Sequence, residues 1–288
     1  MLNCYYSIRM YIEKYPSFIK CQDLMDMADE ISDLFGCKYD QLGYMLLHPD
    51  YDFKDLGVML KNNKKGRKRF AELSIPLKYY GKYDDFPDSP SVEFKLKEKD
   101  SMSLPFYSID LEYPVIDSCC LCIKIDIKEE LLLGKLSLEK FKKVQDIINS
   151  KGYIIDSAFL HYYSGNTRRD ILDGGEWGFI TVNDWRIIDH SRNYQREWKK
   201  RIMDVFYMNS FKKEIVSKDA LRKIINIVGN KNMIDDNGNI YFKLPQSKIE
   251  YLLNRIISTK SRKAIKKLLE DENVCRKDAS IIASVLRL

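Results

Sequence analysis

Apolar and polar residues alternate over several short stretches in the first half of the chain, and this period of two is typical of half-buried strands. The first stretch, residues 4–12 (CYYSIRMYI), is rich in aromatic and β-branched residues. Four further runs are separated by Gly, Pro, Asp and Ser. No helical segment between these runs is long enough to cross between parallel neighbours, so we expect an antiparallel meander. The four runs are FAELSIPLKYY (70–80), SVEFKLKE (91–98), LPFYSIDLEY (104–113) and CCLCIKIDI (119–127).

A period of three to four residues predicts helices between and after these strands. Residues 17–36 carry apolar residues at that spacing, with Ser17 as a candidate N-cap and Gly36 as the stop. Residues 52–63 (DFKDLGVMLKNN) are a shorter helix candidate and lead into KKGRKR, which we expect to be an exposed basic loop at 64–69. A further helix is predicted from Leu138, with its apolar face on Leu138, Phe141, Val144, Ile147 and Ile148 and its end at Gly152.

A strand predicted at 153–163 (YIIDSAFLHYY) follows, and EWGFITV then leads the chain back. Helices set against one mainly antiparallel sheet define an α+β body, which we assign to residues 1–205. Residues 206–288 are expected to form a basic helical module packed on that body. The module contains one short β-hairpin at Asn237-Gly238, because these residues permit positive φ in a tight turn.

Three more helices are predicted in the module. Ser247 and Glu250 stand in the relation of a capping box before an apolar stripe. Residues 262–271 (RKAIKKLLED) and 277–286 (KDASIIASVL) carry helical patterns as well.

Charge is distributed unevenly along the 288 residues, whose formal net charge is +6. Residues 211–288 contain 17 Lys and Arg against 9 Asp and Glu, so the remaining chain is slightly acidic. A basic tail indicates a polyanionic partner, either nucleic acid or an acidic protein surface, although solvated Lys-rich helix faces are also common. Nucleic acid is therefore the alternative partner for residues 211–288.

The N-terminal residues lack the apolar run of a signal peptide, and no window approaches the 18 apolar residues of a spanning helix, so we expect a cytoplasmic protein without membrane contact. Seven cysteines, without paired C-x-x-C knuckles, are interpreted as reduced thiols. No metal site is predicted. Neither a phosphate-binding G-x-x-x-x-G-K-[ST] loop nor a G-x-G-x-x-G after a strand is present, so no cofactor is expected.

Residues 161–179 (HYYSGNTRRDILDGGEWGF) hold the densest group of reactive side chains. In the first interpretation Gly165-Asn166 and Gly174-Gly175 supply turns, and Trp177 and Phe179 are buried. In the second, catalytic interpretation His161 is a general base, Arg168 or Arg169 stabilises phosphate charge, and Glu176 is a second acid or base. No spacing enforces this chemistry, so no catalytic residue is predicted. Loops at strand ends often bind partners. The predicted partner-binding residues are Tyr162, Tyr163, Arg168, Arg169, Asp170, Asp173 and Glu176.

The order of elements over residues 3–190 resembles the α+β immunity proteins that accompany bacterial polymorphic toxins. The resemblance rests on an aromatic first strand (CYYSIRMYIE), an acidic amphipathic helix (QDLMDMADEISDLF), a meander, a helix (LEKFKKVQDII), a strand (IIDSAFLHYY) and a Gly- and Trp-bearing strand (GEWGFITVNDW). It implies a protein that binds a cognate toxin stoichiometrically and blocks it, with no catalytic residues to transfer. The basic module beyond residue 205 departs from this layout.

The sequence therefore favours a non-enzymatic protein that neutralises a protein partner, an antitoxin of a bacterial defence system. The alternative is a nucleic-acid-binding or nucleic-acid-processing protein of a mobile element or phage-defence system that uses the basic C-terminal module. The sequence leaves an enzymatic activity open.

Overall fold

The structure, a computed structural model, describes residues 4–16, 18–47, 57–76, 89–96, 107–112, 121–132, 136–164, 205–245 and 260–274. The fold is α+β with mainly antiparallel strands and flanking helices, which confirms the predicted fold class. Residues 5–158 form one compact unit, and residues 1–4 with 159–288 form the other. The domain boundary expected at residue 205 stays a prediction. The packing of residues 206–288 on the α+β body stays a prediction as well.

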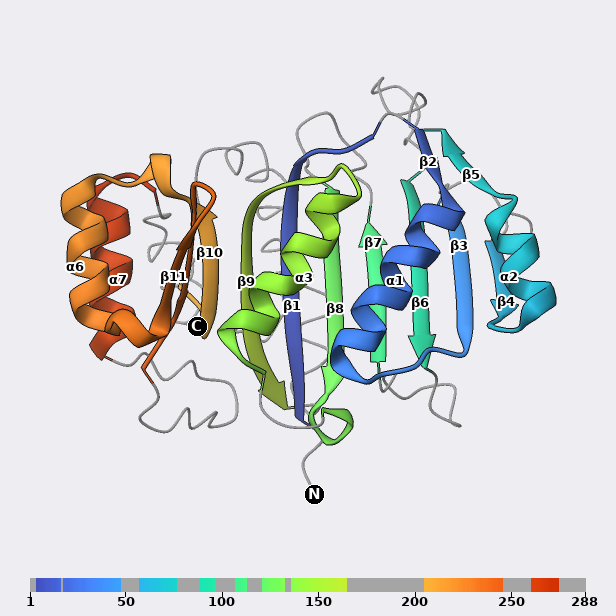
Figure 1. Cartoon of the computed structure of the whole chain (residues 1–288), viewed down its shortest axis with the longest axis horizontal. Helices are drawn as coiled ribbons and strands as arrows, with labels where there is room; N and C mark the ends of the chain where they lie inside the picture. Colours follow the sequence, from blue (N-terminus) through green and yellow to red (C-terminus); the bar gives the residue numbers. More distant parts are fainter. Residues whose placement is uncertain are drawn as a thin grey trace, which may run out of the picture. The chain divides into compact units, whose positions relative to one another are not determined.

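In the unit of residues 5–158 the sheet has the order β9-β1-β8-β7-β6-β3-β4, where only the first part of β9 belongs to this unit (Figure 1). The pairs from β1 to β4 in this order are antiparallel. Three of the four predicted meander runs are present as β6, β7 and β8, whereas Ser74–Pro76 of the first run pair with Phe18–Lys20 in a separate two-stranded sheet. The strands are β1 (Cys4–Lys14), β3 (Gln41–Leu47), β4 (Gly57–Lys61), β6 (Ser89–Leu96), β7 (Tyr107–Glu112), β8 (Leu121–Lys128) and β9 (Ile154–Ser164).

Alternation along each strand places apolar residues on one face of this sheet and polar residues on the other. The register aligns one apolar row across five strands, Ile8, Ile125, Ile109, Phe94 and Leu42, all fully buried. One residue along, the register aligns a charged row on the opposite face: Arg9, Lys124, Asp110 and Glu93. The strand patterns in the sequence thus produce a sheet with an apolar face and an ionic face.

The helices α1 (Cys21–Phe35) and α3 (Leu138–Ser150) cross one face of the sheet (Figure 1). The hydroxyl groups of Ser32 in α1 and Tyr107 in β7 lie 3.0 Å apart, which places α1 over the apolar face. Gly36 ends α1 in the left-handed conformation at φ 67°, as predicted, and Ser137 caps α3 through its side chain.

Three other local predictions were wrong. Residues 18–20 form a strand, β2 (Phe18–Lys20), paired with β5 (Ser74–Pro76), so α1 begins after Lys20 instead of after Ser17. Residues 57–61 form β4 instead of a helix, because pairing with β3 outweighs the helix propensity of Met and Leu. Residues 64–71 form the helix α2 (Lys64–Ala71) instead of a loop.

The second unit contains three antiparallel strands in the order β11-β12-β10, namely β10 (Met208–Lys212), β11 (Met233–Asp236) and β12 (Asn239–Lys243). The predicted turn between β11 and β12 is confirmed, since Asn237 and Gly238 have φ of 49° and 79°. The helices α6 (Lys218–Val228) and α7 (Lys260–Asp271) share one apolar core with these strands. The capping box at Ser247 and Glu250 and the helix predicted at 277–286 lie outside the described residues.

Short 3₁₀ turns lie at Glu129–Leu131, Lys213–Ile215 and Asn230–Asn232. In the part of the chain that the structure describes, no helix has the length and apolar character needed to cross a membrane.

Candidate functional site

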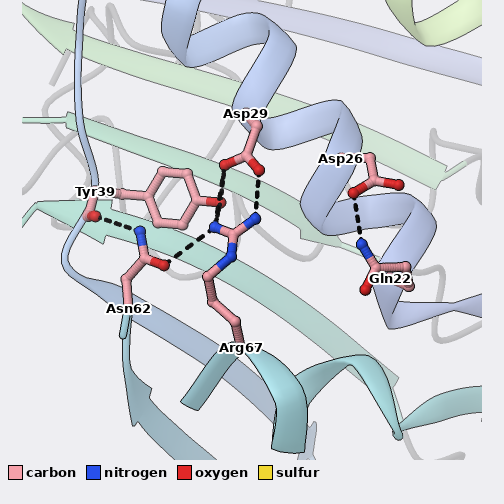
Figure 2. A network of polar contacts seen from close by, with 6 residues as sticks. All are labelled: Gln22, Asp26, Asp29, Tyr39, Asn62 and Arg67. Carbon is pink, nitrogen blue, oxygen red and sulfur yellow. Dashed lines mark hydrogen bonds and ion pairs between the residues drawn. The ribbon is translucent and has the colours of Figure 1, made fainter. Parts of the chain in front are cut away.

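A closed network of polar side chains joins α1 to α2 and is centred on Arg67 (Figure 2). Arg67 Nη2 lies 2.5 Å from Asp29 Oδ2, and Arg67 Nη1 donates to Asp29 Oδ1 at 3.3 Å. The same Nη1 contacts the hydroxyl oxygen of Tyr39 at 3.2 Å and Oδ1 of Asn62 at 3.1 Å. Asn62 in turn donates to the Tyr39 carbonyl at 2.8 Å. The Arg67 guanidinium therefore binds the Asp29 carboxylate in a bidentate manner, which is the strongest geometry for such a pair.

Burial and charge fix the protonation states in this network. Burial raises the pKa of Tyr39, and the hydrogen bond to Asp29 raises it further, so the phenol stays neutral. The hydrogen bonds to Asp29 raise the pKa of Arg67. The side chains of Arg67 and Asp29 are 32% and 39% exposed, so water screens part of the attraction. The network is suited to holding two elements together, because neither Tyr39 nor Arg67 changes its charge near neutral pH.

Three further features position α2. The Asn63 side chain accepts a 2.9 Å hydrogen bond from Gly66 N and caps the helix. A Cβ atom added at Gly66 would lie 1.9 Å from the Lys61 carbonyl oxygen, so only glycine permits this close approach of the helix to β4. On the buried side, Phe70 packs edge-to-face on Phe94, with ring centroids 5.6 Å apart. The Asn63 cap thus fixes the start of the helix, and Gly66 and Phe70 fix its position against the sheet.

The two helices carry opposite and segregated charges. In α1 the five charged residues are all acidic, namely Asp23, Asp26, Asp29, Glu30 and Asp33. In α2 the five charged residues are all basic, namely Lys64, Lys65, Arg67, Lys68 and Arg69. Apart from Arg67, which is half-buried in the network, the cations of α2 are exposed. Glu30 pairs with Lys151, and the Arg67 and Asp29 pair holds the remaining acids of α1 on a helix next to the cations of α2.

The cations of the first turn and the like-charge pairs lower the stability of α2, whereas the helix dipole favours Lys68 and Arg69 in the last turn. Lys64 and Lys65 lie in the first turn, where the helix dipole disfavours cations by about 0.3–1 kcal/mol each. The pairs Lys64 with Lys68 and Lys65 with Arg69 place like charges four residues apart, which costs about 0.2–0.5 kcal/mol per pair. The helix depends on its cap, on Phe70 and on the Arg67 network for its stability.

A second polar cluster lies on the ionic face of the sheet. Asp126 accepts a 2.6 Å hydrogen bond from Ser7 Oγ, and its other oxygen lies 2.9 Å from Lys124 Nζ. Burial favours the neutral form of both groups. The attraction between the Lys124 ammonium and the Asp126 carboxylate outweighs this effect of burial. The pKa of Lys124 is therefore raised, and the pKa of Asp126 is lowered. Both therefore stay charged at neutral pH, and the cluster acts as a structural ion pair.

Two cysteine thiols are described, and both are buried. Burial raises the pKa of Cys21 to about 12 and that of Cys37 to about 11, the latter against the opposing charge of Lys140. Neither sulfur is a ready nucleophile, because the thiolate is the reactive form. Among the described residues, no group of three or more His, Cys, Asp or Glu side chains is arranged to hold a metal ion.

The partner-binding residues predicted from sequence are not tested by this structure. Tyr162 and Tyr163 lie in β9, but their side chains, like that of His161, are outside the described residues. Arg168, Arg169, Asp170, Asp173 and Glu176 lie outside the described residues entirely, as does Trp177. Sequence reasoning missed Asp29, Tyr39, Asn62 and Arg67. The available signal was the contrast between an acidic helix without cations and the run KKGRKR.

No known protein family and no curated protein matches this sequence. The fold is similar to that of a solved structure, the T6SS protein PA0821 of Pseudomonas aeruginosa, with a TM-score of 0.53 and 11% identity. The match covers 94% of this chain and 73% of that chain. At this level of identity the likeness concerns the fold alone.

Proposed function

We propose that this chain is a binding protein that neutralises a protein partner, as the immunity protein of a bacterial toxin system. The observation that carries the proposal is the surface of α1 and α2, where segregated charges are presented on two helices joined by the Arg67 and Asp29 pair. A pre-organised surface of this kind binds with little loss of conformational freedom. The T6SS protein of similar fold supports a context of bacterial secretion.

Co-expression with the product of the adjacent gene tests this function. We expect a stoichiometric complex that survives size exclusion, together with relief of any toxicity of the partner. Absence of both a complex and protection would contradict the proposal.

The stretch of residues 161–179 remains part of this proposal as a second contact region, with Tyr162, Tyr163, Arg168, Arg169, Asp170, Asp173 and Glu176 as its predicted residues. Replacing Arg168 and Arg169 together with Ala is expected to weaken the complex. Because exposed substitutions usually change stability by less than about 0.5 kcal/mol, the fold should be unaffected. A complex of unchanged affinity would remove this stretch from the interface.

Nucleic-acid binding through residues 211–288 is the second candidate, favoured by their net charge of +8, the difference between 17 basic and 9 acidic residues. Several of these cations, however, already pair with acids: Lys213 with Asp235, Lys223 with Asp219, and Lys266 with Glu270. Affinity for a DNA duplex that falls steeply between about 50 and 200 mM salt would favour this candidate.

A further inference from the structure

We propose that the exposed charges of α1 and α2 form a bipolar recognition surface for a protein that presents an acidic patch beside a basic patch. The inference rests on the proposed protein-binding function and names the partner's chemistry. The acidic patch would face α2, and the basic patch would face α1. Charge complementarity of this kind steers association and selects among partners.

The cations of α2 are available for such a contact. Lys64, Lys65, Lys68 and Arg69 are exposed, and none of them forms an ion pair with another residue in the described part of the chain. Lys64 and Lys65 oppose the helix dipole, and each repels a like charge four residues further on, Lys68 or Arg69, although the dipole favours these two cations of the last turn. A helix that retains such charges against its own stability is typical of a binding surface, where function outweighs stability.

The acids of α1 favour a protein over a nucleic acid as the partner. From Lys64 to Arg69 the helix rises only about 8 Å, whereas a DNA duplex carries a phosphate charge every 1.7 Å or so along its whole length. The Arg67 and Asp29 pair holds α1 next to α2, so a duplex lying on α2 would bring phosphates toward Asp23, Asp26 and Asp33. A protein surface with both signs avoids this repulsion.

The network keeps the two charged regions in a fixed relation. Arg67 is the one cation of α2 whose side chain is used internally, and it contacts Asp29, Tyr39 and Asn62 at once (Figure 2). The order of charge across the surface, negative then positive, is therefore built into the fold. A partner must match that order as well as the total charge.

Two synthetic peptides of identical composition provide a test with the full-length protein. In the block peptide a run of Glu is followed by a flexible linker and a run of Lys; in the alternating peptide the same residues alternate. By fluorescence anisotropy at low salt, we expect the block peptide to bind about tenfold more tightly, a difference of about 1.4 kcal/mol. Equal affinities, or no binding of the block peptide, would overturn the proposal.

Charge reversal locates the contact. Lys64→Glu with Lys65→Glu should abolish the preference for the block peptide while leaving α2 folded, because acidic residues are favoured in a first helical turn. The matched control is Lys263→Glu with Lys267→Glu, two exposed cations of α7, which should leave the preference unchanged. Loss of the preference in both variants, or in neither, would contradict the assignment to α2.

A DNA duplex serves as the competing probe. If the duplex binds more tightly than the block peptide, and the variant with Lys64→Glu and Lys65→Glu loses this binding, the partner of the surface is a nucleic acid and not a protein.

Failure of this surface is also distinct from failure of the proposed function. If the adjacent-gene product binds the wild type and the α2 variant equally, the neutralising function stands while the bipolar surface is excluded.

Discussion

The hydroxyl of Tyr39 donates a 2.5 Å hydrogen bond to Oδ1 of Asp29, a residue ten positions earlier in the chain. The same hydroxyl accepts from Arg67, so the phenol lies between an acid of α1 and a cation of α2. The Tyr39 ring also packs edge-to-face on Phe94, with centroids 5.3 Å apart. One side chain therefore connects the charged surface to the apolar core beneath it.

Replacing Tyr39 with Phe should keep the ring contact and remove the hydroxyl. Asp29 then loses a donor and Arg67 loses an acceptor, but both are partly exposed and water replaces some of the lost contacts. We expect the free energy of unfolding to fall by about 1 kcal/mol. Urea denaturation measures this change, and a loss of less than about 0.3 kcal/mol would show that the hydroxyl contributes nothing net.

Elements with a full periodic pattern were predictable from the sequence, while elements held by tertiary contacts were not. Residues 4–12 and 138–152 carry enough alternating or helical positions to reveal β1 and α3. In α2 the only residues buried are Gly66 and Phe70, so no apolar stripe marks the helix. The three strand residues Phe18–Lys20 are recognisable only through their pairing with β5.

The candidate site was hidden for a related reason. Arg67 and Asp29 are 38 residues apart in sequence, and no spacing rule connects them. Each charged segment, taken alone, has the composition of a solvated helix face, and most segments of that composition have no other role. Segregation of charge between two segments becomes informative only when the fold brings those segments together. The stretch that the sequence did single out, residues 161–179, lies mostly outside the described residues.

Gly66→Ala separates helix propensity from packing. Propensity alone would stabilise α2 by about 1 kcal/mol, because alanine favours a helix over glycine. The added Cβ would meet the Lys61 carbonyl oxygen at 1.9 Å, so the helix must shift instead. We expect a net loss of about 1–3 kcal/mol in unfolding free energy.

The matched control for Gly66→Ala is Lys68→Ala on the exposed side of the same helix, which should change stability by less than about 0.5 kcal/mol. A stabilised Gly66→Ala variant would contradict the close approach of α2 to β4.

Asp126→Asn should destabilise the unit of residues 5–158 strongly. Lys124 and Asp126 are 8% and 3% exposed, so the substitution leaves a buried ammonium without its closest counter-charge. Breaking such a pair from one side costs about 3–5 kcal/mol. Asp235→Asn, in an ion pair whose partners are 44% and 50% exposed, is the control and should cost less than about 1 kcal/mol. Equal losses of unfolding free energy in the two variants would contradict the distinction between the buried and the exposed ion pair.

Alkaline pH should unfold the protein. Burial raises the pKa of Tyr39, Tyr107 and Tyr207 in the folded state, so the folded chain holds these protons more tightly than the unfolded chain does. Their contribution is complete below the unfolded tyrosine pKa of about 10 and is lost as the pH rises above it. Phenolate absorbance should therefore rise together with loss of circular dichroism. Ionisation of all tyrosines in a still folded protein would contradict this prediction.

The β2 and β5 ribbon has a consequence for how this protein can change over evolutionary time. β2 leads directly into α1, β5 follows α2, and Cys21 N bonds to the Leu73 carbonyl at 3.2 Å. The ribbon thus ties the start of one charged helix to the end of the other, using backbone hydrogen bonds that do not depend on exposed side chains. Asp23, Asp33, Lys64 and Lys68 are free of this framework. Substitutions at these four positions can therefore accumulate while the scaffold itself stays the same.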